Sequence, residues 1–163
     1  MSIFEAQLEK DRANFEPLTP VSFLRRAAQV VPSHTAIIHG QRRYSYAQFL
    51  ERSSRLADAL AGRGVSRGDC VAIMGANTPE MLEAHNGVPM LGAVLNSLNI
   101  RLDAKTIAFI LDHGEAKVLL TDRAFSEIIK EALTLTEREL LVIDIDDAPE
   151  EGGKFLGSIE YEA

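Results

Sequence analysis

The sequence contains no tryptophan, and only one of its 163 residues, Cys70, is a cysteine. A single cysteine cannot form an internal disulfide, so the fold must rest on noncovalent packing, and a reducing, intracellular compartment is favoured. No apolar stretch approaches the roughly 20 residues that a membrane-spanning helix requires. The N-terminus also lacks the basic and then apolar order of a secretion signal. We therefore expect a soluble, cytoplasmic protein.

Positive charge is in short supply. The chain has 17 Lys and Arg against 24 Asp and Glu, which gives a formal net charge of −7. A phosphate backbone is repelled by such a field, so nucleic acid is not an expected partner. Much of the acid lies between residues 144 and 162, however, whereas several arginines precede it. A local basic site is therefore compatible with the acidic total.

Catalytic motifs are missing as well. The glycine-rich run 62–68 (GRGVSRG) has the wrong spacing for a dinucleotide fingerprint and precedes a strand, which favours a helix end and a turn. No triphosphate-binding loop and no Ser or Cys nucleophile motif is present. No two histidines are three or four residues apart, so no metal site is expected. The residues by themselves therefore predict no catalytic centre.

Two single residues have alternative interpretations. Cys70 opens an apolar run without a nearby histidine, which is typical of a small buried hydrophobe. His85 falls on a predicted helix beside apolar residues such as Leu82 and Val88. We favour a hydrogen-bonded core histidine at this position and keep a role in lining a substrate pocket as the alternative.

The first third of the chain predicts helix, hairpin and helix. Thr19 followed by Pro20 is typical of a helix N-cap and a first-turn proline, and the helix should cover about 20–31. A hairpin is expected around Gly40. Ser45 and Gln48 have the spacing of a capping box, which predicts a second amphipathic helix.

From residue 70 onward, apolar strand patterns alternate with helix patterns. Strands are expected at 70–74, 93–98, 117–121 and 140–143, and helices at 79–91, after Asp103, and at 123–133. Pro89 should kink or end the first of these helices. Three β-α-β steps with short connections predict an α/β fold, with a mostly parallel sheet flanked by helices on both faces and a short N-terminal hairpin.

We divide the chain into three parts: an N-terminal leader at 1–18, an α/β subdomain at 19–145, and an acidic loop with the start of a truncated helix at 146–163. The last part begins with a breaker-rich acidic run, and a helix is expected to start near Phe155. Because that helix would have no C-cap, we expect the natural protein to continue past Ala163.

Several segments, taken in order and spacing, resemble a known family. They are the runs 44–49 (YSYAQF), 68–74 (GDCVAIM), 77–80 (NTPE), 87–102 (GVPMLGAVLNSLNIRL), 110–113 (ILDH) and 116–122 (AKVLLTD). This pattern resembles the adenylate-forming superfamily of AMP-binding enzymes, and above all acyl-CoA synthetases of the medium- and long-chain fatty acid and butyrate-ligase-like branch. The string in 89–102 is its most specific part.

The resemblance implies the N-terminal portion of the large domain of such an enzyme. Family members convert a carboxylic acid, MgATP and CoA to acyl-CoA, AMP and pyrophosphate through an acyl-adenylate. The family's phosphate loop, ribose-binding aspartate and catalytic lysine lie downstream of the matched region. The resemblance therefore implies ATP, Mg²⁺ and CoA as cofactors of the full-length enzyme in fatty acid metabolism, none bound to this segment, and no activity for the segment alone.

The resemblance also implies a site. The bend at 98–101 should flank the CoA channel, with Asn99 and Arg101 as cofactor-binding residues. A guanidinium suits phosphate recognition, but a structural arginine that holds the bend is the alternative for Arg101. Some long-chain members dimerise through N-terminal segments, so residues 1–18 are a candidate for a homodimer contact.

A second class of function stays open at this stage. The chain could instead be a stand-alone, non-catalytic α/β binding or regulatory module. The coding sequence immediately after codon 163 discriminates the two readings, because a ligase requires a downstream Thr/Ser/Gly-rich loop with a lysine.

Overall fold

The computed structural model describes residues 15–147 and 153–163. The predicted leader at 1–18 therefore lies largely outside the described residues, as does most of the predicted acidic loop. The helices are α1 (Pro20–Val30), α2 (Tyr46–Gly62), α3 (Pro79–Met90), α4 (Ala104–His113) and α5 (Ser126–Leu135), with the short 3₁₀ helix η1 (Arg123–Phe125) before α5. The strands are β1 (Thr35–His39), β2 (Arg42–Ser45), β3 (Cys70–Met74), β4 (Val94–Ser97), β5 (Ala116–Asp122), β6 (Leu141–Ile145) and β7 (Ile159–Glu160).

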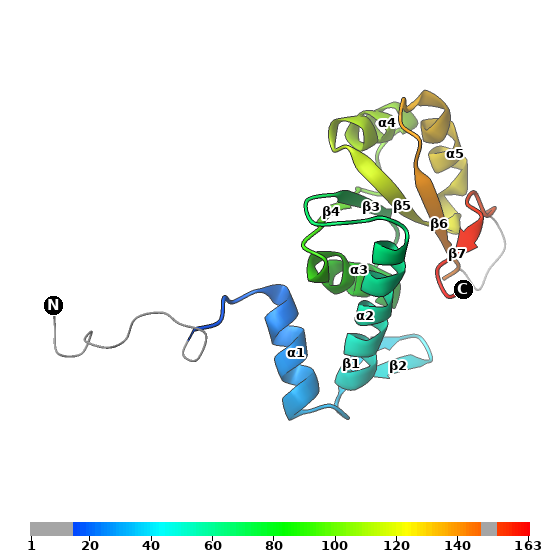
Figure 1. Cartoon of the computed structure of the whole chain (residues 1–163). Helices are drawn as coiled ribbons and strands as arrows, with labels where there is room; N and C mark the ends of the chain where they lie inside the picture. Colours follow the sequence, from blue (N-terminus) through cyan, green and yellow to red (C-terminus); the bar gives the residue numbers. More distant parts are fainter. Residues whose placement is uncertain (1–14, 148–152) are drawn as a thin grey trace, which may run out of the picture.

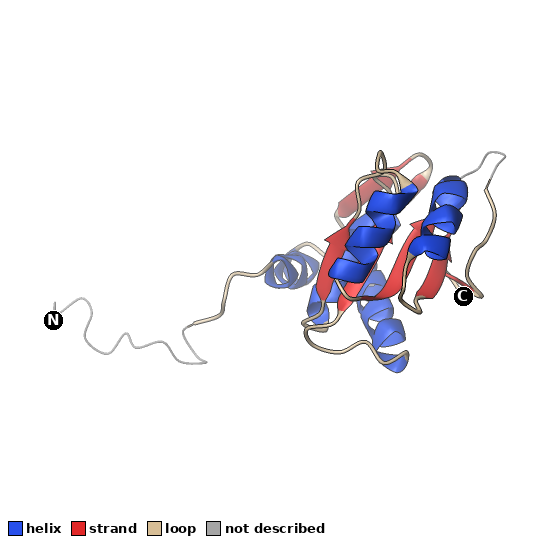
Figure 2. Ribbon diagram, turned by 90° about the horizontal axis from the view of Figure 1, so that it is seen from above, coloured by secondary structure: helices blue, strands red, loops and turns tan. Residues whose placement is uncertain are grey.

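The main sheet has five parallel strands in the order β4-β3-β5-β6-β7. Helices α2 and α3 cover one face and α4 and α5 cover the other (Figures 1 and 2). A separate antiparallel hairpin of β1 and β2 lies beside the N-terminal end of α2 (Figure 1). The predicted α/β fold, with helices on both faces and an N-terminal hairpin, is confirmed.

Strand β3 is the centre of the core. All five of its residues are buried, and its side chains alternate between the two helix layers. Val71 and Ile73 pack towards α2 and α3, whereas Ala72 and Met74 pack towards α4 and α5. Burial on both faces is the reason that the strand is a continuous apolar run and not an alternating one. Cys70 is buried with it, and burial raises the pKa of its thiol, as expected for a structural cysteine.

The helix boundaries follow the predicted caps. Thr19, Ser45, Thr78 and Asp103 each accept a hydrogen bond from a backbone N–H of the first helical turn. Helix α3 contains Pro89 and ends one residue later, as predicted, because proline has no N–H to donate and its ring clashes with the carbonyl of the preceding turn. These caps are local chemistry, so the sequence predicts them reliably.

The predicted helix start near Phe155 is wrong, because residues 153–158 are irregular and lead into a fifth parallel strand, β7, at Ile159–Glu160. The buried carboxylate of Asp144 accepts the backbone N–H groups of Leu156 and Gly157 at 3.0 and 2.7 Å. A Cβ atom at Gly157 would lie 2.1 Å from the carbonyl oxygen of Val142. The chain is therefore held against β6 by contacts that a helix could not make.

Helices α2 and α3 approach each other closely at Gly87. A Cβ atom there would lie 2.7 Å from the backbone oxygen of Ser53 and 3.1 Å from a methyl group of Leu56. Ser53 is fully buried at this contact. The backbone of α2 cannot move aside cheaply, so the packing of the two helices requires glycine at this position.

We expect Gly87→Ala to destabilise the chain by about 1–3 kcal/mol, because the added methyl group overpacks the contact between α2 and α3. Thermal unfolding should therefore occur several degrees lower. Gly62→Ala is the matched control, since Gly62 also lies in a helix but has nothing within 4 Å of its Cβ position. An equal change in both variants would show that helix propensity and not packing decides the effect.

Candidate functional site

The strand order reverses direction between β3 and β5. The chain passes from β3 to β4 on one side and then returns to β5 on the other side of β3. In open α/β sheets, ligands bind outside the carboxyl ends of the strands at such a switch point. Here the loop 75–78 follows β3, and Asp122 ends β5. A ligand-binding site is therefore expected at this edge of the sheet.

A cluster of charged side chains occupies this edge. One Arg42 amino group lies 2.7 Å from Glu80 Oε1, and the other pairs with Asp147. His39 Nε2 lies 3.1 Å from Asp147 Oδ2. Arg42 and His39 both come from the hairpin, whereas Glu80 stands in the first turn of α3 and Asp147 follows β6. We call Arg42, His39, Glu80, Asp147 and Asp122 the edge cluster.

Burial controls the electrostatics of the edge cluster. Asp122 is 4% exposed, and burial, together with the nearby carboxylates of Asp147 and Glu80, raises the pKa of its carboxyl group. The N–H of Ala124 donates to Asp122 Oδ1 at 2.9 Å and opposes this shift. Burial disfavours the charge on Arg42, but Glu80 and Asp147 outweigh it, so the pKa of Arg42 is raised.

A small apolar pocket of about 150 Å³ lies beside the edge cluster, between the hairpin and the start of α3. Ile37 and Ile38 line it from the hairpin, and Met81 and Leu82 line it from α3. Asn77 and His39 add polar atoms at its wall.

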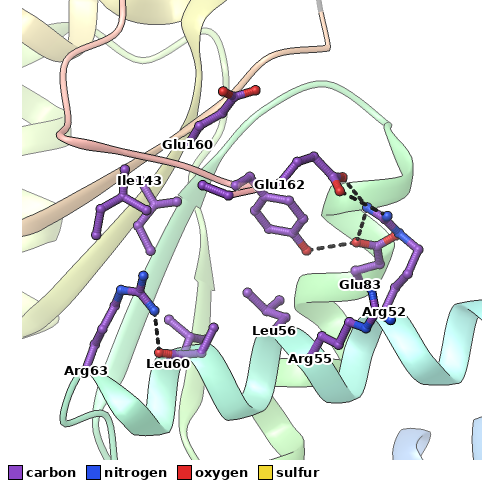
Figure 3. Close-up of a pocket in the computed structure, with 13 residues that line it drawn as sticks. Arg52, Arg55, Leu56, Leu60, Arg63, Glu83, Ile143, Glu160 and Glu162 are labelled. Atoms are coloured by element: carbon purple, nitrogen blue, oxygen red, sulfur yellow. Dashed lines mark hydrogen bonds and ion pairs between the residues drawn. The ribbon is translucent and has the colours of Figure 1, made fainter.

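A second charged network joins α2 and α3 to the end of the described chain. Arg52 Nε lies 2.5 Å from Glu83 Oε1, and the same guanidinium pairs with Glu162. The Tyr161 hydroxyl donates to Glu83 Oε2 at 2.9 Å. Figure 3 shows Arg52 reaching from α2 to both carboxylates. Glu83 is fully buried, and a buried carboxylate needs such partners.

This network flanks a larger pocket of about 190 Å³ between α2 and residues 159–163. Leu56, Leu60, Ile143 and Ile159 supply apolar lining (Figure 3). Burial and the neighbouring Glu83 raise the pKa of the Tyr161 hydroxyl, and Arg52 opposes this shift. The hydroxyl therefore stays protonated and acts as a hydrogen-bond donor that holds the end of β7 to α3.

The structure separates the residues that the sequence predicted as a site. Asn99 and Arg101 are exposed in the turn between β4 and α4, where Asn99 Oδ1 accepts the backbone N–H of Arg101 at 2.9 Å. His85 is exposed on α3, and its Nδ1 lies 2.8 Å from the backbone oxygen of Met81. The core reading of His85 is therefore wrong. None of the three residues lines either pocket.

Two other properties concern the described ranges 15–147 and 153–163 only. No group of three or more His, Cys, Asp or Glu side chains is arranged there to hold a metal ion. Within the same ranges, no helix combines the length and the apolar character that crossing a bilayer demands.

Comparison with known proteins defines the family. Residues 24–160 match the model of the AMP-binding enzyme family. The chain therefore belongs to the AMP-binding enzymes, and its fold is the parallel α/β fold of adenylate-forming enzymes. It is 46% identical to a peroxisomal acetate/butyrate–CoA ligase of Arabidopsis thaliana over 95% of its own length. It spans only 29% of the length of that relative.

Solved structures agree with this assignment. A protein from Rhodopseudomonas palustris that is assigned as a long-chain-fatty-acid CoA ligase is 30% identical, with a TM-score of 0.76 over 89% of this chain and 35% of that chain. The O-succinylbenzoate CoA synthetase of Bacillus subtilis, solved in complex with ATP and magnesium ion, is 30% identical. Its TM-score is 0.63 over 75% of this chain and 24% of that chain.

Sequence reasoning missed both charged networks. Arg42 and Arg52 pair with Glu80 and Glu83, which are 38 and 31 residues away in sequence. One signal was available: Glu80 and Glu83 lie three residues apart, on the same side of the helix as the apolar residues Ala84, Gly87 and Val88. Buried acidic residues imply cationic partners, but the pattern does not say which arginines supply them.

We expect Asp122→Asn to raise the melting temperature at neutral pH. A raised folded-state pKa means that folding favours the protonated carboxyl group, so ionised Asp122 lowers stability as the pH rises above the unfolded value of 3.8. Asparagine removes the charge and keeps the oxygen that accepts the N–H of Ala124. The gain should shrink as the pH falls to about 4 or below.

Thermal unfolding from acidic to neutral pH measures this difference. Asp58→Asn is the control, because Asp58 is exposed on α2. A pH-independent gain, or a loss at neutral pH, would contradict the assignment of an unfavourable buried charge to Asp122.

Proposed function

We propose that this chain is the N-terminal segment of an ATP-dependent acyl-CoA synthetase. The parent enzyme would join a carboxylic acid to CoA with ATP and Mg²⁺ and release AMP and pyrophosphate. The observation that carries the proposal is the 46% identity to an acetate/butyrate–CoA ligase over almost the whole chain. Similarity of fold alone would not support the ligase proposal, since one fold hosts many activities.

The substrate that we infer is a short carboxylic acid. The relative with the name acetate/butyrate–CoA ligase supports this choice. We propose ATP, Mg²⁺ and CoA as cofactors of the parent enzyme, which the B. subtilis synthetase in complex with ATP and magnesium ion supports. The location predicted from the sequence is the cytoplasm, but the Arabidopsis relative is named as peroxisomal. The homodimer through residues 1–18 and the three-part division of the chain stay predictions.

Within this proposal, the described residues act as scaffold. Arg42, Glu80, Asp147 and His39 pair with one another at the switch point, and the edge cluster itself contains no Ser or Cys. The Glu83 carboxylate is likewise occupied by an ion pair with Arg52 and a hydrogen bond from Tyr161. Neither network leaves a poised acid and base pair of the kind that acyl transfer chemistry requires.

The 163-residue chain by itself should release no pyrophosphate with acetate or butyrate, MgATP and CoA. The longer protein should release it in a manner that depends on both the acid and ATP, because the chain supplies packing surfaces and not reacting groups. A coupled pyrophosphate assay on both forms decides the matter. Turnover by the short chain would contradict the scaffold role, and a longer protein without acyl-CoA formation would contradict the ligase assignment.

We further propose that Arg101 and Asn99 flank the path of CoA in the parent enzyme, and that His85 faces its substrate pocket. Both side chains of the turn are exposed, and Asn99 fixes the backbone at Arg101, which leaves the guanidinium available for a phosphate. His85 uses only Nδ1 for its hydrogen bond within the described residues, so Nε2 faces outward for a ligand or a later part of the chain.

In the longer protein, Arg101→Ala should raise the KM for CoA on the order of tenfold, as expected for the loss of one charge-assisted contact. The value of kcat and the KM for ATP should change little, because the contact positions CoA and takes no part in adenylation. Lys105→Ala is the control, as Lys105 is also an exposed cation, two residues beyond the turn at the start of α4. A lower melting temperature with unchanged KM would instead support the structural role of Arg101.

A further inference from the structure

The edge cluster has an unusual arrangement for a switch point. Arg42 pairs with Glu80, in the helix that follows β3, and with Asp147, in the segment that follows β6. Strand β5 lies between β3 and β6, and its last residue is the buried Asp122. The guanidinium therefore bridges two loops across the carboxyl end of the strand between them, at the position where open α/β sheets take up ligands.

One buried atom in this cluster has no partner among residues 15–147 and 153–163. Glu80 is 3% exposed, and its Oε1 accepts from Arg42, but its Oε2 makes no hydrogen bond to any described residue. A buried carboxylate oxygen without a donor is rare and requires an explanation. Two carboxylates, Glu80 and Asp147, contact the Arg42 guanidinium, and the buried Asp122 carboxyl group interacts electrostatically with both of them. The free Glu80 oxygen therefore leaves the site with spare capacity for a hydrogen-bond donor.

We propose that the carboxylates of the edge cluster form a guanidinium-binding site whose resident ligand is the side chain of Arg42. The planar fork of a guanidinium matches two separated carboxylates, and an ammonium group does not. The hairpin β1–β2 thereby closes the switch point from within the same chain. This site is distinct from the proposed ligase function and does not rest on it.

The bland alternative is an ordinary pair of surface salt bridges. Arg42 is 35% exposed at its side chain, and exposed pairs contribute little to stability. The binding site and the ordinary salt bridge predict different behaviour when Arg42 is removed. A binding site that loses its tethered ligand should accept the same chemical group from solution, whereas a surface salt bridge leaves no site behind.

The test is chemical rescue of Arg42→Ala. We expect this variant to melt on the order of 5 °C or more below the parent chain, because the buried Glu80 carboxylate loses the cation that neutralises it within the described part of the chain. Methylguanidinium chloride at tens of millimolar should raise the melting temperature of the variant, as a ligand that binds only the folded state must. Sodium chloride at equal ionic strength should not.

Three matched proteins make the rescue specific. The parent chain should gain nothing from methylguanidinium, since its site is filled. Arg43→Ala removes the neighbouring, exposed arginine of β2 and should show neither the loss nor the rescue. The double variant Arg42→Ala/Glu80→Gln should lose most of the rescue, because the buried acceptor is no longer charged. Equal effects of methylguanidinium on all of these proteins, or none on Arg42→Ala, would overturn the proposal.

If Arg42→Ala does not fold, Glu80→Gln in the parent chain provides the second route. This change weakens the site without removing the hairpin. Amide hydrogen exchange should then speed up in residues 35–45 but not in β3 or β5, since only the docking of the hairpin depends on the site. Unchanged exchange in the hairpin would refute a ligand-like role for Arg42.

Discussion

The constraint on which this structure depends is the burial of a parallel sheet on both faces. Each parallel connection must cross over the sheet, and the connections from β3 to β4, from β4 to β5 and from β5 to β6 each contain a helix that covers one face. Strands β4 and β5 lie on opposite sides of β3, so the connecting helices cover opposite faces of the sheet and β3 is fully buried between them. The close approach of α2 and α3 at Gly87 follows from the same demand, since two helices must share one face.

Buried charged residues of this chain connect separate elements, and we call each such connection a joint. Glu80 and Glu83 are both enclosed within α3, and each is reached by an arginine from an earlier element. The first joint docks the hairpin on the carboxyl edge of the sheet, and the second docks the end of β7 on the α2–α3 layer with the help of Tyr161. Removing one partner of such a pair leaves a buried charge, so each joint is sensitive although its net contribution is modest.

In this member of the AMP-binding enzymes, the hairpin covers the switch point of the sheet, and its side chains occupy the polar groups there. The polar groups at the carboxyl edge are directed to one another and to the hairpin. The turn at Asn99 and Arg101 and the face of α3 at His85 are exposed and lie outside the edge cluster. The chain spans 29% of its Arabidopsis relative, and these surfaces are where the proposed function places CoA and substrate.

The sequence by itself determined the caps at Thr19, Ser45, Thr78 and Asp103, the apolar strands, their βαβ order and the family. These features depend on residues close in the chain, or on a periodicity that survives without partners. Only the tertiary structure decided that residues 159–160 form a strand, that His85 is exposed, and which arginine neutralises Glu80 or Glu83. The strand and the arginine partners depend on groups 12 or more residues apart meeting across packed elements, as when the Asp144 carboxylate accepts the backbone N–H of Leu156, and no local pattern records such a meeting. The exposure of His85 depends on which side of α3 packs against the sheet and α2, which the sequence of α3 does not specify.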